Sequence, residues 1–169
     1  HNEVSEKSIE KYEKFSKALK SIFDIKLGFS VYKQNEIDLL IKNRINFDII
    51  QIPRNLNIQL DLSGFKTSNF DVYLRSIFLQ GLYFSSIKNE FPNNVKNKIY
   101  IQKDFLISMG KKHNFNLGQY LFSEAVSYCK IRNYKGIVVG SSSIDRISSY
   151  IKNHRFIDIL NHKYINNLI

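Results

Sequence analysis

The stretch VYLRSIFLQGL, residues 72–82, decides the fold that this sequence predicts. It begins as a short apolar strand, turns at Arg75-Ser76 and leaves through Leu-Gln-Gly. Short, nearly continuous apolar runs are typical of strands in parallel sheets, which are covered on both faces. Polar residues directly after such a run lie at the carboxyl end of the strand, where parallel barrels place their functional groups. The stretch therefore predicts a buried parallel strand that presents polar side chains at its end.

The rest of the chain alternates similar strands with amphipathic helices. We predict strands at residues 25–31, 47–52, 70–76 and 134–139, and helices at residues 5–22, 35–43, 102–112, 117–131 and 143–152. Ser5 and Asn35 are the predicted N-caps of the first two helices. Residues 55–69 and 84–97 are predicted connections, and residues 156–169 fit a terminal amphipathic helix. This alternation predicts a parallel α/β sheet in one domain.

Length, charge and residue content restrict the function classes. With 169 residues and 19.9 kDa, the chain has the length of one domain. The net charge of +10 suggests nucleic-acid binding, but the lysines of the first helix alternate with glutamates, as in the pairs Glu10 to Lys14 and Glu13 to Lys17. We therefore expect a solvated helix face and no nucleic-acid partner.

The same inspection gives no sign of a membrane protein or a metal site. No apolar run reaches the roughly 18 residues of a membrane span, and no secretory signal is recognisable, so we expect a cytoplasmic protein. The single cysteine, Cys129, falls in a helix-like run, where we expect a small buried side chain. No zinc-ligand spacing of cysteines or histidines occurs, and we expect no metal.

Three further stretches accompany the first one in a fixed order. They are GFSVY at residues 28–32, FDIIQIP at residues 47–53 and GIVVGSSS at residues 136–143. Together the four stretches resemble the aldo-keto reductases over residues 1–153. The resemblance implies NAD(P)H-dependent reduction of an aldehyde or ketone. It also implies a (β/α)8 barrel, which needs about 250 residues, so this chain is expected to form its second half.

The expected architecture is accordingly a partial parallel (β/α) barrel of the TIM type. We expect a single domain over residues 1–169, with a C-terminal tail from about residue 154.

The resemblance also implies cofactor-binding residues at the ends of the four strands. Ser30 and Gln51 match positions that hydrogen-bond the nicotinamide carboxamide, and Arg75 matches the position that stacks on the nicotinamide. The residues implied for the phosphates and the adenosine end are Ser76, Phe78, Gln80, Gly81, Gly140, Ser141, Ser143 and Arg146. The implied cofactor is NADP(H). NAD(H) is the alternative, because Ser149 and Tyr150 replace the Glu-Asn pair that holds the adenine in the family.

Most catalytic residues of the family fall outside the implied half. Its Asp, Tyr and Lys belong to the first half of the barrel, and only His1 matches, at the position of the histidine that orients the substrate oxygen. His1 has a second interpretation as a residue left from a purification tag. The chain is therefore expected to carry cofactor-binding residues without a complete catalytic set.

The residues alone also allow other roles for the candidate site and for the whole chain. Ser143 and Asp145 equally fit an ordinary helix N-terminus. Ser30 also fits the start of a turn, and Gln51 also fits a side chain that satisfies backbone groups. Half a barrel leaves two strand edges unpaired, near residues 25–29 and 136–139, and such edges seek partners. The chain is thus also a candidate for a non-catalytic interaction or assembly module. The expected partners are the missing N-terminal half-barrel or a second copy of the chain, and a small carbonyl substrate.

Overall fold

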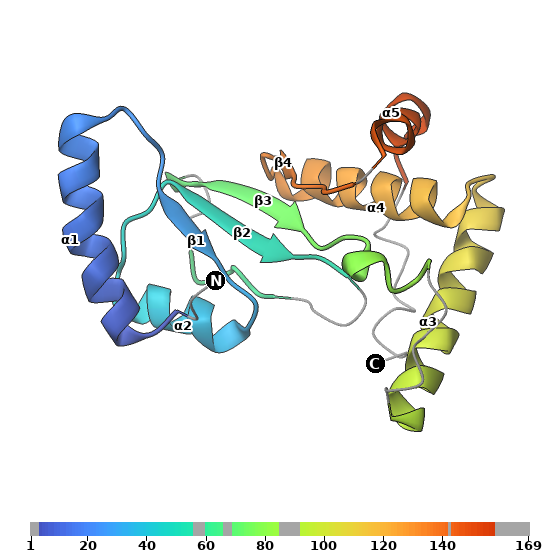
Figure 1. The fold of residues 1–169 in the computed structure, drawn as a ribbon, viewed down its shortest axis with the longest axis horizontal. Helices are drawn as coiled ribbons and strands as arrows, with labels where there is room; N and C mark the ends of the chain where they lie inside the picture. Colours follow the sequence, from blue (N-terminus) through green and yellow to red (C-terminus); the bar gives the residue numbers. More distant parts are fainter. Residues whose placement is uncertain (1–3, 56–59, 66–68, 85–91, 142, 158–169) are drawn as a thin grey trace.

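The computed structural model describes residues 4–55, 60–65, 69–84, 92–141 and 143–157, except for the side chains of Gln80 and Val95. Four parallel strands form one sheet in the order β1-β2-β3-β4 (Figure 1). They are β1 (Gly28–Ser30), β2 (Ile49–Pro53), β3 (Asp71–Arg75) and β4 (Gly136–Ile137). Each strand pairs with the next strand of the chain, as consecutive (β/α) units of a barrel do. The predicted parallel α/β sheet is confirmed.

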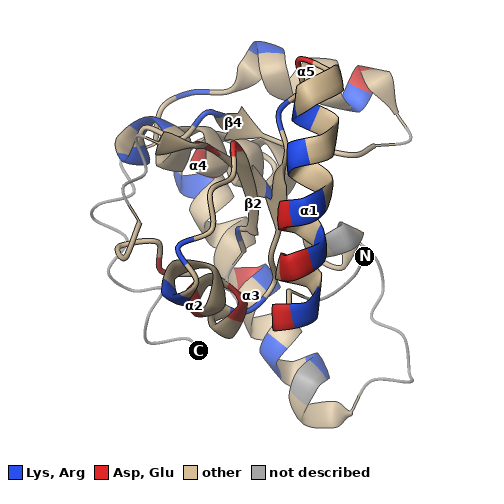
Figure 2. Cartoon of the chain, turned by 90° about the vertical axis from the view of Figure 1, so that its left-hand side faces the viewer, with Lys and Arg blue, Asp and Glu red and all other residues tan. Residues whose placement is uncertain are grey.

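Helices precede, connect and follow the strands along the chain, and in space they lie beside the sheet. The helices are α1 (Glu6–Ile22), α2 (Gln34–Lys42), α3 (Asn93–Lys112), α4 (Leu117–Arg132) and α5 (Ile144–Asn153), with a short 3-10 helix, η2 (Leu79–Gly81), after β3. In Figure 1, α1 and α2 lie at the β1 side, and α4 and α5 lie at the β4 side. Lysines and glutamates alternate along the outer face of α1 (Figure 2), as predicted.

Helix caps explain where the predicted boundaries hold and where they fail. Ser5 caps α1, because its side chain accepts a hydrogen bond from the Ser8 amide at 3.3 Å. The predicted cap at Asn35 is wrong. Helix α2 begins at Gln34, with Lys33 as N-cap, because the Glu36 carboxylate accepts the Lys33 amide from inside the first turn.

Three further elements differ from the prediction. Strand β1 begins at Gly28 rather than at residue 25. Helix α3 begins at Asn93 rather than near residue 102, since Pro92 has the fixed backbone angle that suits a helix start. Strand β4 has only two paired residues where we predicted six, because pairing with β3 ends at Ile137. The predicted tail helix lies mostly outside the described residues, and residues 154–157 have no regular secondary structure.

The core has two parts. The larger one packs side chains of the sheet, such as Ile50 and Leu74, against Ile37 and Leu40 of α2 and Ala125 of α4. The smaller one joins α3, α4 and the segment after β3. Cys129 is buried in the larger core and donates a hydrogen bond from its thiol to the Gly136 carbonyl at 3.4 Å, while burial raises the pKa of this thiol to about 11. The predicted buried cysteine is confirmed.

Gly28 provides a test of the first strand pair. A Cβ atom at this position would overlap the carbonyl oxygen of Ile49 on β2, which is backbone and cannot move aside. We expect Gly28→Ala to lower the free energy of unfolding by about 1–3 kcal/mol, the usual cost of forcing extra atoms into a packed site. Urea denaturation measures the change, with Gly140→Ala as control, because a Cβ at Gly140 meets no atom within 4 Å. Equal stabilities of the two variants would contradict the close strand packing.

No helix in the described part of the chain is long and apolar enough to cross a membrane.

Candidate cofactor site

Of the three residues predicted for the nicotinamide end, Ser30 and Arg75 lie at the carboxyl ends of their strands, whereas Gln51 lies in the middle of β2. Ser30 ends β1 and lies directly opposite Gln51 of β2, and Arg75 ends β3 opposite Pro53. The Ser30 and Gln51 side chains are half-buried and form no hydrogen bond with any other described residue. They therefore present unpaired donor and acceptor groups at one edge of the sheet.

Arg75 is held inside the protein rather than reaching into solvent. Its side chain is 8% exposed, and its guanidinium donates to the carbonyl of Val31 at 2.7 Å and to the Ser76 hydroxyl at 3.1 Å. It also stacks 3.6 Å from the ring centroid of Tyr32. Burial lowers the pKa of this arginine, and Tyr32 and Glu36 partly offset that effect. The group remains charged at neutral pH, and its Nε–H is buried without a hydrogen-bond partner.

The segment after β3 has an unusual backbone. Ser76 and Leu79 have positive φ angles of 56° and 46°, and Gly81 follows with 83°. Left-handed conformations are uncommon for residues other than glycine and concentrate at binding and catalytic sites. The segment that decided the predicted fold is therefore also the one with the most strained backbone in the described site.

Most of the remaining predicted residues meet around a cavity of about 450 Å³, here called the α5 cavity. It lies between the segment after β3 and the turn from β4 into α5. Six of the predicted cofactor residues line it, namely Ser76, Phe78, Gly81, Gly140, Ser141 and Arg146. These residues come from two segments that are distant in the sequence and that the fold brings together.

The N-terminus of α5 forms one wall of this cavity. Ser143 is the N-cap, and its side chain accepts the Arg146 amide at 3.3 Å. The Ser141 hydroxyl accepts the Ser143 amide at 3.1 Å. Arg146 is exposed and forms no ion pair with a described residue. A cation beside a helix N-terminus creates a positive potential that suits an anionic ligand.

Aromatic side chains form another wall of the cavity, and of these only Phe78 was predicted as a cofactor residue. Tyr150 is buried, and its ring centroid lies 5.6 Å from that of Phe78, which lies 5.8 Å from that of Phe84. Ile147 and Tyr150 lie three residues apart on α5, so both face the cavity. Two signals in the sequence pointed to this place for Tyr150: the spacing from Ile147, and its match to the Glu-Asn pair that holds the adenine in the family.

Two predicted residues cannot be placed in this geometry. His1 lies outside the described residues, and for Gln80 only the backbone is described, within η2. Among the described residues, no group of three His, Cys, Asp or Glu side chains could hold a metal ion.

The fold has the form of half a (β/α)8 barrel, as two solved structures show. The structure is similar to a glycerol dehydrogenase from Gluconobacter oxydans, with a TM-score of 0.58 and 13% identity, over 85% of this chain and 48% of that one. It is also similar to an aldo-keto reductase from Bacillus halodurans in its holo form, with a TM-score of 0.60 and 17% identity, over 95% and 55% of the two chains. The chain thus spans about half the length of these enzymes. No family model and no curated protein sequence matches the chain.

Proposed function

We propose that this chain is the cofactor-binding half of an NAD(P)H-dependent oxidoreductase that reduces an aldehyde or ketone. The α5 cavity carries the proposal, because six residues chosen from the sequence for cofactor binding line that one cavity. The fold of the two similar enzymes supports the same class. The substrate is a small carbonyl compound, and the proposed location is the cytoplasm.

The described residues fit a dinucleotide at both ends. Arg146 and the α5 N-terminus suit a phosphate, and the Phe78 and Tyr150 rings suit a flat nucleobase. Ser30 and Gln51 have free polar groups that suit the nicotinamide carboxamide. NADP(H) is the proposed cofactor, since the exposed Arg146 has no carboxylate partner of its own among the described residues, and NAD(H) is the alternative.

When bound, the nicotinamide supplies the hydride for carbonyl reduction. The residues of this chain bind and orient it: Ser30 and Gln51 fix the ring plane, and the Arg75 guanidinium supports the loop beside it through Val31. His1 is the proposed orienting group for the substrate oxygen. The general acid would come from the other half of the barrel, so we expect no turnover by this chain alone.

Cofactor binding by the chain alone tests the proposal. We expect NADPH to bind in isothermal titration calorimetry and Arg146→Ala to weaken its binding about tenfold, because a charge-assisted phosphate contact is lost. Lys152→Ala is the matched control, since it removes a cation from the other end of the same helix. Absence of NADPH binding, or equal weakening by both variants, would refute the proposed site.

A non-catalytic interaction module is the second candidate function. Its support is that β1 and β4 are end strands of the described sheet, each with one side unpaired. This candidate would be favoured if calorimetry detects no NADPH binding while light scattering shows that the chain associates with a partner.

A further inference from the structure

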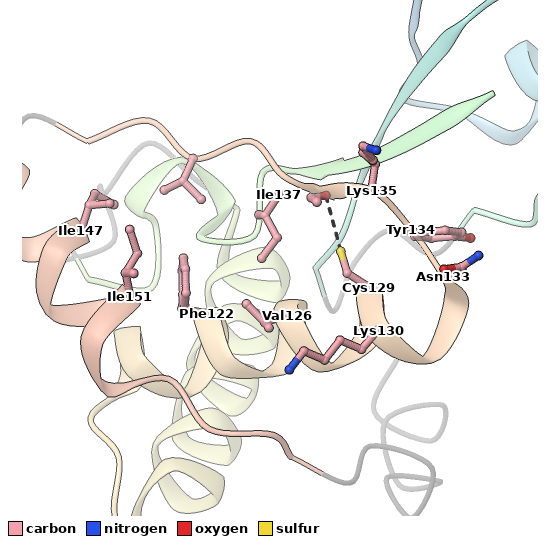
Figure 3. A pocket seen from close by; sticks show the side chains of 12 residues that line it. Phe122, Val126, Cys129, Lys130, Asn133, Tyr134, Lys135, Ile137, Ile147 and Ile151 are labelled. Atoms are coloured by element: carbon pink, nitrogen blue, oxygen red, sulfur yellow. Dashed lines mark hydrogen bonds between the residues drawn. The ribbon is translucent and has the colours of Figure 1, made fainter.

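A second hollow, here called the β4 hollow, lies between α4, β4 and α5 (Figure 3). Its volume is about 720 Å³, within the range of about 300–1,000 Å³ that is typical of small-molecule sites. Only Val139 and Ile147 line both this hollow and the α5 cavity. None of the residues predicted for cofactor binding lines the β4 hollow, so it is a second candidate site with a ligand of its own.

Three pairs of apolar side chains form the walls of the β4 hollow. They are Phe122 and Val126 of α4, Ile137 of β4 with Val139 just after it, and Ile147 and Ile151 of α5. The pairs on the helices are four residues apart and the pair at β4 is two apart, so each pair lies on one face of its segment. All but Phe122 remain at least partly exposed, and Ile151 is 54% exposed. An alkyl chain that covers these side chains would remove their apolar surface from water, which favours binding.

The end of the hollow away from α5 is cationic. Figure 3 shows Lys130 on the α4 wall and Lys135, which directly precedes β4, on the opposite wall. Both side chains are exposed and form no ion pair within the described part of the chain. None of the described residues that line the hollow is acidic. Two lysines without a counter-charge at one end of an apolar hollow favour an anionic group there.

The C-terminus of α4 lies at the same end, and carbonyl groups at a helix C-terminus carry partial negative charge. Here the Cys129 carbonyl accepts the Tyr134 amide at 2.8 Å, and the Lys130 carbonyl accepts the Asn133 amide at 3.3 Å. This tight turn is possible because Asn133 has a left-handed φ angle of 53°. These carbonyl groups are therefore already paired, and the two lysines dominate the charge at this end.

We propose that the β4 hollow binds a free single-chain amphiphile with an anionic head group, such as a medium-chain fatty acid. Its alkyl chain lies along the apolar walls, and its head group lies between Lys130 and Lys135. The α4 wall from Phe122 to Lys130 is about 12 Å long, which suits an alkyl chain of medium length. A neutral ligand would leave both ammonium groups without a counter-charge, so the charge selects an anion. This inference goes beyond the proposed function and does not depend on it.

Isothermal titration calorimetry with decanoate, below its critical micelle concentration, tests the inference. We expect decanoate to bind, and a decyl chain with a trimethylammonium head group to bind about tenfold more weakly, because the lysines repel the cation. High salt should weaken the binding of decanoate, since the charges of exposed lysines are screened. Vesicles of anionic phospholipid, examined by co-sedimentation, distinguish a free amphiphile from a lipid surface.

A pair of double variants tests the cationic end. Replacing both Lys130 and Lys135 by Ala should weaken the binding of decanoate about tenfold, because the charge beside the head group is lost. Replacing both Lys98 and Lys112 by Ala is the matched control, since it removes the same charge from α3 and should have little effect. All four side chains are exposed, so both double variants should fold, and circular dichroism checks this.

A pair of single variants tests the apolar walls. Ile151→Ser should weaken the binding of decanoate about fivefold, because apolar contact with the alkyl chain is lost. Ile101→Ser on α3 should leave the binding unchanged, and the two side chains are equally accessible, with exposed fractions of 54% for Ile151 and 55% for Ile101.

Four results would overturn the inference: no binding of decanoate, equal binding of the cationic amphiphile, equal effects of a variant and its control, or binding to anionic vesicles without binding of decanoate. NADPH titration separates these outcomes from the proposed function, because Lys130, Lys135 and Ile151 do not line the α5 cavity. Loss of decanoate binding with intact NADPH binding would refute the amphiphile site and leave the cofactor site in place.

Discussion

Replacing Glu124 by Gln is expected to lower the free energy of unfolding by about 3–5 kcal/mol, because it leaves a buried arginine without its counter-charge. Glu124 of α4 accepts a hydrogen bond from Arg54, just after β2, at 2.7 Å, and the two side chains are only 14% and 15% exposed. The Arg54 guanidinium also lies 4.0 Å from the ring centroid of Tyr128. Urea denaturation followed by circular dichroism measures the change.

Two controls separate the buried charge from a general effect of substitution. Arg54→Met combined with Glu124→Leu should recover most of the stability, because a buried ion pair exchanged for apolar groups leaves no unpaired charge. Lys26→Ala should have a much smaller effect, since the Lys26 side chain is 62% exposed in its ion pair with Asp71. A Glu124→Gln variant as stable as Lys26→Ala would show that the Arg54 pair contributes little.

Replacing Glu36 by Gln is expected to cost about 2–4 kcal/mol, because a buried carboxylate accepts several backbone hydrogen bonds. Glu36 is 2% exposed and accepts the amides of Val4 at 2.9 Å, Tyr32 at 2.6 Å and Lys33 at 2.9 Å. It therefore joins the start of the described chain to the loop after β1. Asp38→Asn on the exposed face of α2 is the matched control, and an equal loss in both variants would contradict the role of Glu36.

The same carboxylate makes part of the stability depend on pH. Burial raises the pKa of Glu36, but the amides of Tyr32, Val4 and Lys33 outweigh burial, so the net pKa lies below the ordinary 4.5. A carboxyl with a lowered folded pKa stabilises fully above its unfolded pKa and loses that contribution as pH falls through the folded one. The stability difference between the wild type and Glu36→Gln should therefore shrink below about pH 4. A stability difference between the wild type and Glu36→Gln that stays constant from neutral to acidic pH would contradict the lowered pKa of Glu36.

Much of the fold was predictable because its strands are short apolar runs that end in polar residues. The run at 47–52 identified β2, and the run at 70–76 identified β3 within one residue at each end. The start of α2 at Gln34 was hard to predict, because its N-cap Lys33 is not a usual capping residue and the Glu36 carboxylate accepts the Lys33 amide in its place. The bond from the Val4 amide to the same carboxylate joins segments that are distant in the sequence. The sequence also could not show that β4 is short, since strand pairing depends on a neighbour rather than on local preference.

The candidate site was predictable at the level of strand ends but not of side-chain partners. Ser30 and Gln51 lie side by side because parallel pairing aligns their strands. The enclosure of Arg75 by Val31 and Tyr32 depends on how the loop after β1 folds over β3, which no local pattern encodes. The contact of Tyr150 with Phe78 could not be predicted for a similar reason, since the two rings come from segments that are 72 residues apart in the sequence.

The hydrogen bond from the Arg75 guanidinium to the Val31 carbonyl affects the kinetics and the entropy of ligand binding. One guanidinium joins the ends of β1 and β3, so the loop beside Ser30 is ordered before any ligand arrives. A molecule that docks there loses little free energy to freezing that loop, and preorganisation of this kind strengthens affinity without adding a contact. Loss of the Arg75–Val31 hydrogen bond should therefore lower the association rate of the bound molecule and raise its dissociation rate, even though Arg75 is buried.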